Sequence, residues 1–181
     1  MSTLKPWKKL NSKIVFEHPW LTVYEDSIEL PDGTKDVYIH FGSKAKTSSV
    51  AIIAIRNDGK ILMQKELSYP IGEFLWQWPG GGTEAGETIE QSANRELMEE
   101  AGYRADSIEL LQEMHVNNRR SANRQAVVVA RQLRAASLPA DTGEAFEHHW
   151  MSEAEIDSLI KQGEISHAHF LAGWTLYKLK K

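Results

Sequence analysis

The segment LWQWPGGGTEAGETIEQSANRELMEEAGY, residues 75–103, decides how the rest of the chain is interpreted. Its aromatic start predicts the end of a strand at Pro79, because proline cannot donate to a sheet ladder. The glycines from Gly80 to Gly82 follow directly. Glycine tolerates positive φ and lets backbone carbonyl groups come close to a ligand. We therefore predict a strand end that leads into a loop able to bind through its backbone.

A helix is predicted over residues 88–101. This stretch contains no Gly or Pro, Thr88 or Glu87 is placed to begin the helix, and Gly102 is placed to end it. At roughly 100° per residue, one side of the helix carries an apolar stripe that suits a protein core. The stripe consists of Ile89, Ala93, Leu97 and Ala101.

A second face of this helix is acidic. Glu96, Glu99 and Glu100 fall within an arc of roughly 100°, where like charges destabilise an isolated helix. Converging carboxylates make sense around a hard divalent cation such as Mg²⁺, which prefers oxygen ligands. The alternative is a solvated face on which Arg95 pairs with Glu99. The glycine loop, with Glu87 and Arg95 at a fixed spacing from it, favours the metal site.

This spacing resembles the Nudix box of the Nudix hydrolases. Gly81 is followed by five residues, Glu87, seven residues, Arg95-Glu96-Leu97, one residue, Glu99-Glu100, one residue and Gly102. Tyr103 then stands where the pattern has an aliphatic residue. The resemblance implies an α/β fold, a Nudix α/β/α sandwich with a mixed sheet.

The resemblance also implies roles for the residues of the box. Glu96, Glu99 and Glu100 would hold Mg²⁺, with Mn²⁺ as an alternative, and the Gly80 carbonyl would complete the inner shell. Glu87 would hold Arg95 and so fix the loop against the helix.

The general base would come from a loop well after the box, and the segment DTGEAFEHHW, residues 141–150, resembles that region. Glu144 is the first candidate. Glu147 could act as a base or as a further metal ligand, and Asp141 is the third candidate. The alternative is that these are solvent-exposed loop acids.

Composition bounds the class of protein. The chain has 181 residues, of which 41% are hydrophobic and 25% charged, as expected for a globular domain with a small appendage. A net charge of −4 gives no basic field that would favour nucleic acid. The absence of cysteine, of an apolar secretion signal and of a membrane-length apolar run fits a cytoplasmic protein.

The first 45 residues predict a β-rich extension that precedes a Nudix domain over residues 46–181. We expect a loosely held arm at residues 1–12, short strands at 14–16 and 21–24, and a hairpin at 27–41 that turns at Pro31-Asp32-Gly33. Nudix enzymes that hydrolyse ADP-ribose and nucleotide sugars often carry an N-terminal antiparallel sheet and dimerise through it. By this resemblance we expect a homodimer.

The sequence of residues 46–181 predicts several strands before and after the box. The run VAIIAI, residues 50–55, reads as a buried strand, and Asn57-Asp58-Gly59 predicts a turn into a partner strand at 61–65. Further strands are predicted at 108–116, 125–133 and 147–151. A capping box at Ser152 predicts a helix that ends at Gly163. A last helix from Ser166 would bury Ala168, Leu171, Ala172, Leu176 and Leu179.

Candidate substrate contacts lie outside the box. The segment NNRRSANR, residues 117–124, carries Arg119, Arg120 and Arg124, whose guanidinium forks suit phosphate oxygens. The alternative is a solvated hairpin loop. Trp20 or Tyr24 could stack on a nucleotide base, also across a dimer.

The layout favours a nucleoside diphosphate sugar, such as ADP-ribose or GDP-mannose, split by water into a nucleoside monophosphate and a sugar phosphate. ADP-ribose-type members usually have Glu where this chain has Gln77, an Arg near Glu66 to Ser68, and a Pro near Asn118. These departures leave the base and the sugar open.

Two other functions compete with this one. The WQWP run is similar to the WQFP run of enzymes that act on dinucleoside polyphosphates or on RNA 5′ ends. A non-catalytic Nudix domain that senses a nucleotide is the other class, but such domains usually lose box acids, and every box acid is present here.

Overall fold

The computed structural model describes residues 4–42, 48–139, 143 and 145–181, and the chain divides into two units. The first unit combines Met1–Thr47 with His115–Asn123, and the second combines Ser48–Met114 with Arg124–Lys181. No helix among the described residues is long and apolar enough to cross a membrane.

The first unit is built on an antiparallel sheet in the order β1-β2-β3, formed by β1 (Lys8–His18), β2 (Leu21–Glu29) and β3 (Lys35–Gly42). The predicted hairpin is confirmed. The Gly33 amide donates to the Leu30 carbonyl at 2.9 Å, and the Thr34 amide donates to Asp32 Oδ1 at 2.9 Å. The N-terminal antiparallel extension therefore exists as predicted.

The expectation of a loose arm at residues 1–12 is wrong for Lys8 onward. β1 starts at Lys8 and pairs with β2, with Ile14 opposite Tyr24. Every residue of β1 is exposed, so no buried apolar alternation marks the strand in the sequence. Backbone hydrogen bonds, which any side chain permits, extend the strand beyond its apolar centre.

The second unit contains two three-stranded sheets and three helices. One sheet has the order β4-β8-β7, from β4 (Ser48–Ala54), β8 (Arg124–Ala135) and β7 (Tyr103–His115). The other has the order β6-β5-β9, from β6 (Glu73–Gln77), β5 (Ile61–Ser68) and β9 (Glu147–Met151). A single antiparallel bridge between Ile55 and Ile61 joins the two strand sets within the described residues.

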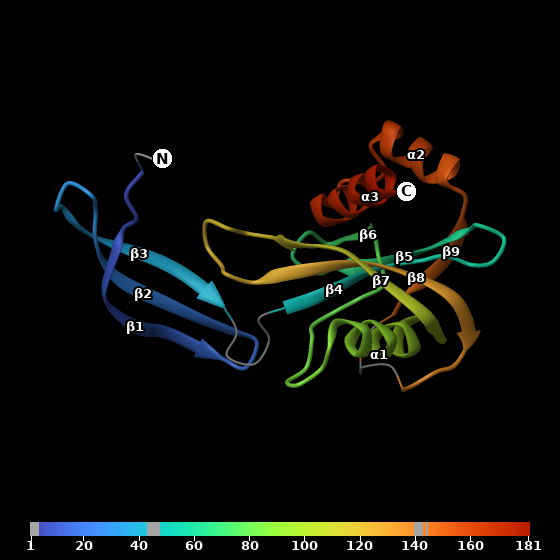
Figure 1. Cartoon of the computed structure of the whole chain (residues 1–181), viewed down its shortest axis with the longest axis horizontal. Helices are drawn as coiled ribbons and strands as arrows, with labels where there is room; N and C mark the ends of the chain where they lie inside the picture. The colour runs from blue at the N-terminus through green and yellow to red at the C-terminus, as the bar shows by residue number, and fades with distance from the viewer. Residues whose placement is uncertain (1–3, 43–47, 140–142, 144) are drawn as a thin grey trace. The chain divides into compact units, whose positions relative to one another are not determined.

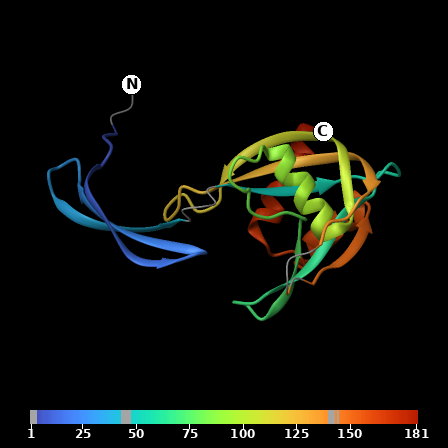
Figure 2. The same cartoon turned by 90° about the horizontal axis from the view of Figure 1, so that it is seen from below.

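The three helices cover both faces of these strands. The helix α1 (Ile89–Ala101) lies on one face, and α2 (Glu153–Gln162) and α3 (Ala168–Lys180) lie on the other (Figure 1). Seen from below, α1 crosses in front of the strands, with α3 behind them (Figure 2). β4 is parallel to β8, whereas β5 pairs antiparallel with β6 and β9. The predicted α/β/α sandwich with mixed strand directions is confirmed.

The predicted pairing of residues 50–55 with 61–65 is confirmed only next to the turn, at the bridge between Ile55 and Ile61. Along the rest of its length β4 pairs with β8, with Ile52 opposite Val128. Val50 and Ile52 belong to the core under α1, whereas Ala51 and Ile53 belong to the core under α2 and α3. A strand buried on both faces reads as a continuous apolar run, which is typical of a parallel strand in a sandwich.

The predicted face of α3 is wrong in part. Leu171 and Leu176 pack against the core at its edge, as predicted. The residues that the helix buries are Phe170, Gly173, Trp174 and Tyr177, whereas Leu179 is 76% exposed. Trp78 stacks on Phe170 with ring centroids 3.9 Å apart, and Trp174 donates to Asp157 of α2 at 2.8 Å. α3 is apolar on several sides, so the periodicity alone could not select the face that the aromatic residues occupy.

The predicted limits and core face of α1 are confirmed. Thr88 caps the helix by accepting from the Gln91 amide at 3.2 Å, and the Gln91 side chain in turn accepts from the Thr88 amide. Gly102, with φ of 70°, ends the helix. Ala93 and Leu97 are fully buried, and Ile89 and Ala101 pack against the same core at its edge.

We expect Leu97→Ala to lower the free energy of unfolding by about 2–5 kcal/mol, because the deletion leaves a cavity under α1. Urea denaturation followed by circular dichroism measures this loss. Leu179→Ala is the matched control. It makes the same deletion at a side chain that is 76% exposed and should change stability by less than about 0.5 kcal/mol. Equal losses in the two variants would contradict the assigned core.

Candidate active site

The glycine loop runs beside β4 and is bound to it through the backbone. The Ile52 amide donates to the Pro79 carbonyl at 2.8 Å, and the Val50 amide donates to the Gly81 carbonyl at 2.9 Å. Gly80 lies between these contacts with φ of 144°, and a Cβ there would lie 2.1 Å from the Val50 carbonyl oxygen. Only glycine fits this position without a shift of the backbone.

The Gly80 amide is bound to α1 and not to β4. It donates to Glu100 Oε2 at 2.8 Å. No hydrogen bond to the Gly80 carbonyl occurs among the residues that the structure describes, although the carbonyls on both sides accept bonds from β4. The Gly80 carbonyl is thus available to a ligand.

Gly81 leaves room for a carboxylate. A Cβ at Gly81 would lie 2.5 Å from Glu96 Oε1, so this glycine lets the Glu96 side chain reach the loop. Glu96 is 9% exposed, which makes it a buried acid on α1. Loop and helix therefore meet where the sequence places the acidic face.

Arg95 links the helix to the loop. Its Nε donates to Glu87 Oε1 at 2.8 Å, and its Nη2 donates to the Gly82 carbonyl at 2.9 Å. Its Nη1 donates to Glu96 Oε1 at 2.9 Å and to Glu99 Oε2 at 3.0 Å. These bonds raise the pKa of Arg95, the bond to Glu87 most of all, and the same bond lowers the pKa of Glu87. Arg95 and Glu87 are therefore both charged at neutral pH.

The predicted metal ligands lie on one side of α1, but each is held by protein donors. Arg95 joins Glu96 and Glu99, and Gly80 holds Glu100. Among the described residues no three acidic or histidine side chains are arranged around a common ion position. The chemistry of the donor set fits a hard divalent cation, because every candidate donor is an oxygen atom.

Gln64 belongs to this site and was missed by the sequence interpretation. It is 1% exposed on β5, and its Nε2 donates to Glu100 Oε2 at 3.2 Å. Its Oε1 is buried and has no hydrogen-bond partner among the described residues. A polar residue within the buried run ILMQ was the signal that could have revealed it, because buried polar groups are normally satisfied.

Of the three candidate bases, only Glu147 lies within the described residues. Glu144 and Asp141 lie outside the described residues. Glu147 begins β9, where its side chain is 68% exposed and its Oε1 lies 2.5 Å from His149 Nε2.

The three candidate phosphate-binding arginines do not all belong to the same unit. Arg119 and Arg120 belong to the first unit, whereas Arg124 begins β8 in the second unit and pairs with Glu113 at 3.6 Å. The two candidate stacking residues lie in the first unit as well. Trp20 is 76% exposed, and Tyr24 stacks on His40 with ring centroids 5.0 Å apart.

The model of the NUDIX domain matches residues 45–174 of the chain. The chain belongs to the Nudix family. The N-terminal domain model of nucleoside diphosphate sugar hydrolases matches residues 7–38, which correspond to most of the antiparallel sheet. The expected resemblance to the nucleotide-sugar branch of the Nudix hydrolases is therefore confirmed. Members of this family generally use divalent metal ions.

Curated relatives agree with this placement. The chain is 32% identical over 104 residues to an ADP-ribose pyrophosphatase of Bacillus subtilis (strain 168), an alignment covering 56% of this chain and 53% of that protein. It is 30% identical over 154 residues to an ADP-ribose pyrophosphatase of Mycobacterium tuberculosis (strain ATCC 25618 / H37Rv), with 82% of this chain and 72% of that protein covered. The alignments with the first relatives span about half of their length.

A solved structure has the same Nudix fold. It is described as an ADP compounds hydrolase, and it matches with a TM-score of 0.89 at 22% identity. The match covers 98% of this chain and 95% of that chain. Because the identity is only 22%, this match is evidence for the fold and not for the activity.

We expect Gly80→Ala to lower the free energy of unfolding by about 3 kcal/mol or more, because the substitution combines an unfavourable φ with a backbone clash. Gly59→Ala is the control. Gly59 has φ of 81°, but a methyl group added there would meet open space, so only the conformational penalty of about 1 kcal/mol applies. Chemical denaturation compares the two variants. Similar losses would mean that the loop can move away from Val50.

Proposed function

We propose that the chain hydrolyses the pyrophosphate bond of a nucleoside diphosphate sugar in the presence of Mg²⁺, giving a nucleoside monophosphate and a sugar phosphate. The observation that carries this proposal is the contact of the acidic face of α1 with the glycine loop through Arg95 and the Gly80 amide. It gathers carboxylates beside an available backbone carbonyl at a position where an oxygen-liganded cation would sit.

In this proposal Glu96, Glu99 and Glu100 hold the metal together with the Gly80 carbonyl, and Mn²⁺ is an alternative ion. When bound, the ion neutralises pyrophosphate oxygens and lowers the pKa of a bound water. Arg95 keeps Glu96 and Glu99 on one side of the helix, and Glu87 fixes Arg95 through two bonds, at 2.8 and 3.1 Å.

Gln64 is a positioning residue in this scheme. With the Gly80 amide it holds one oxygen of Glu100, so the orientation of that carboxylate is set before any ligand arrives. For the proton transfer from water we propose Glu144 as the general base, with Glu147 as the second candidate and Asp141 as the third. All three belong to the late acidic segment, residues 141–150, which is the reason for proposing them.

Two observations support a nucleotide-sugar substrate. The match of residues 7–38 to the N-terminal domain model is the first, and the ADP-ribose pyrophosphatase names of two relatives are the second. Gln77 donates to Glu66 Oε2 at 2.9 Å, in the region where the ADP-ribose-type members have Glu and Arg. Because this chain departs from those members here, the base and the sugar stay open, and we keep both ADP-ribose and GDP-mannose as candidates.

We further propose that Arg119, Arg120 and Arg124 contact phosphate groups and that Trp20 or Tyr24 stacks on the base. A homodimer through the N-terminal strands is proposed as well. β1 is an edge strand of its sheet and exposes Ile14 and Phe16, and an edge with apolar side chains suits pairing with a second copy. The lack of cysteine agrees with a cytoplasmic setting.

We expect turnover of ADP-ribose or GDP-mannose with Mg²⁺, and none after chelation with EDTA. The panel also contains a dinucleoside polyphosphate and a triphosphate-ended RNA, and phosphate release and product chromatography detect each reaction. Turnover confined to the last two substrates would contradict the nucleotide-sugar proposal. No turnover of any substrate, with nucleotide still bound, would favour a sensing domain.

We expect Glu100→Gln to lower kcat by about 100-fold or more, because it removes a negatively charged ligand. The melting temperature should barely change, since a glutamine oxygen can still accept from the Gly80 amide. Glu90→Gln is the control, an exposed acid in the first turn of α1. Steady-state kinetics and thermal denaturation are the measurements. Equal activity of the two variants would argue against the metal assignment.

A further inference from the structure

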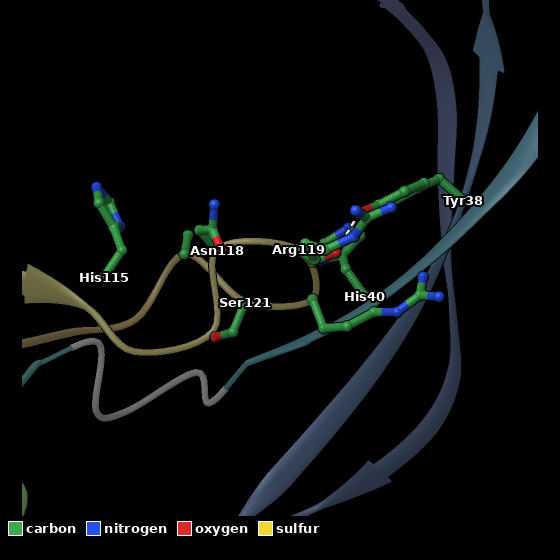
Figure 3. A pocket seen from close by; sticks show the side chains of 8 residues that line it. Tyr38, His40, His115, Asn118, Arg119 and Ser121 are labelled. Atoms are coloured by element: carbon green, nitrogen blue, oxygen red, sulfur yellow. Dashed lines mark hydrogen bonds between the residues drawn. The ribbon is translucent and has the colours of Figure 1, made fainter. Parts of the chain in front are cut away.

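A cavity of about 410 Å³ lies within the first unit, between β3 and the segment His115–Asn123 (Figure 3). Two of its lining residues, Tyr38 and His40, are alternate residues of β3 and so project from the same face of that strand. Further lining residues come from the segment; they are His115, Asn118, Arg119, Arg120, Ser121 and Ala122.

The walls of this cavity are fixed to each other. The Phe41 amide donates to the Arg120 carbonyl at 2.8 Å, and Arg120 Nη1 donates to the Ile39 carbonyl at 2.9 Å. The Tyr38 hydroxyl donates to the Arg119 carbonyl (Figure 3). Backbone bonds from Arg120 and Ser121 to the Asn117 carbonyl close a turn within the segment. One backbone bond and two side-chain bonds to backbone carbonyl groups therefore hold the walls of the pocket together.

The side chains that line the cavity favour a negatively charged ligand. It contains two arginines and two histidines and no carboxylate among the described residues. The Arg120 guanidinium lies 5.4 Å from the centre of the Tyr38 ring, so it is oriented by the ring as well as by the Ile39 carbonyl. The Arg119 side chain forms no ion pair or hydrogen bond within the described part of the chain. A planar guanidinium without such a bond can donate two parallel hydrogen bonds to the oxygens of a phosphate.

A nearby acid does not cancel this charge. Asp26 is 7% exposed and binds His40 Nε2 at 3.1 Å and Lys9 Nζ at 3.4 Å. This buried carboxylate therefore already has a cationic partner, Lys9, and accepts or shares a hydrogen bond with His40. The field at the cavity remains that of the arginines.

The size of the cavity indicates more than a bare ion. Small-molecule sites commonly have volumes of roughly 300–1,000 Å³, and this one lies in that range, whereas inorganic phosphate would leave most of it empty. Asn118 offers an acceptor and two donors for sugar hydroxyl groups, and His115 and Tyr38 add ring surface. We propose that this cavity binds a phosphate monoester carried on a sugar, either a nucleoside monophosphate or a simple sugar phosphate.

Both products of the proposed hydrolysis belong to this class of compound. That the physiological ligand is a reaction product rests on the proposed function. The anion preference of the cavity rests only on its own residues. The first unit would then hold a product-type ligand independently of the metal ion at α1.

The test is a calorimetric titration of the full chain in EDTA, which removes the contribution of divalent ions at α1. The probes are adenosine monophosphate, ribose 5-phosphate and inorganic phosphate. Arg119→Gln should weaken binding of the preferred probe by about tenfold or more, because it removes a charge-assisted contact. The variant keeps the Arg119 backbone carbonyl that Tyr38 binds, so the pocket should remain folded.

Two variants serve as controls. Arg134→Gln removes the same charge from an exposed side chain in the second unit, where it pairs with Asp106, and should bind as the unmodified chain does. Glu100→Gln should also leave binding in EDTA unchanged. Circular dichroism spectra compare the folds of the three variants.

The outcomes separate the ligand sources. Tighter binding of adenosine monophosphate than of ribose 5-phosphate supports a nucleotide ligand, and equal binding supports a sugar phosphate. Inorganic phosphate that binds as tightly as both would overturn the proposal, as would no binding of any probe. A loss in Glu100→Gln without a loss in Arg119→Gln would place the ligand at α1 and overturn it too.

Failure of this inference is distinct from failure of the proposed function. Binding in EDTA that depends on Arg119, with no hydrolysis of any substrate, would leave the cavity assignment intact and reject the proposed activity. Hydrolysis that depends on Glu100, with no Arg119-dependent binding in EDTA, would reject the cavity assignment and leave the metal-dependent hydrolysis intact.

Discussion

The contact of Arg95 with Glu87, Glu96 and Glu99 is the interaction on which the second unit depends. The Arg95 side chain is only 18% exposed, so its charge needs these partners. Its bond to the Gly82 carbonyl fixes the loop against the helix at the same point. One positive charge faces three carboxylates, and Glu100 adds a fourth acid nearby. The excess negative charge in this protein-held cluster is what a divalent cation would balance.

The sandwich supports this cluster from both sides. β4 divides its apolar residues between the core under α1 and the core under α2 and α3, so the strand to which the glycine loop binds is packed on both faces. On the α3 side, Trp78 donates to the Phe170 carbonyl at 3.2 Å, and a Cβ at Gly173 would lie 2.9 Å from the Trp78 ring nitrogen. The residue that precedes Pro79 is thus tightly enclosed, and the loop begins from a fixed point.

What the sequence could predict was local. Thr88, Gly102 and the four-residue spacing of Ala93 and Leu97, about one helical turn, define α1 without information from elsewhere in the chain. The salt bridge between Glu87 and Arg95 was implied by the resemblance to the Nudix box, in which both residues belong to one short segment.

What the sequence could not predict depended on distant partners. β4 pairs with β8, more than seventy residues away, and the adjacent turn at Asn57-Asp58-Gly59 suggested a nearer partner. α3 offers apolar residues on several sides, and its buried face is set by Trp78 and Asp157. β1 has no buried residue at all, so its extent follows from the backbone of β2. The segment His115–Asn123 joins the first unit through bonds to β3 that no spacing in the sequence announces.

Residues whose conformation, charge or burial costs stability gather around Glu100. Gly80 has a backbone conformation and a close approach to Val50 that exclude other residues, and Glu96 and Glu100 are like charges one helical turn apart. Gln64 is buried with an oxygen that no described residue satisfies, which costs free energy that an apolar residue would not. Because Gly80 and Gln64 both bind the same oxygen of Glu100, these departures serve one carboxylate. A fold selected for stability alone would avoid all three, so their convergence on Glu100 is best explained by a demand on that group's position.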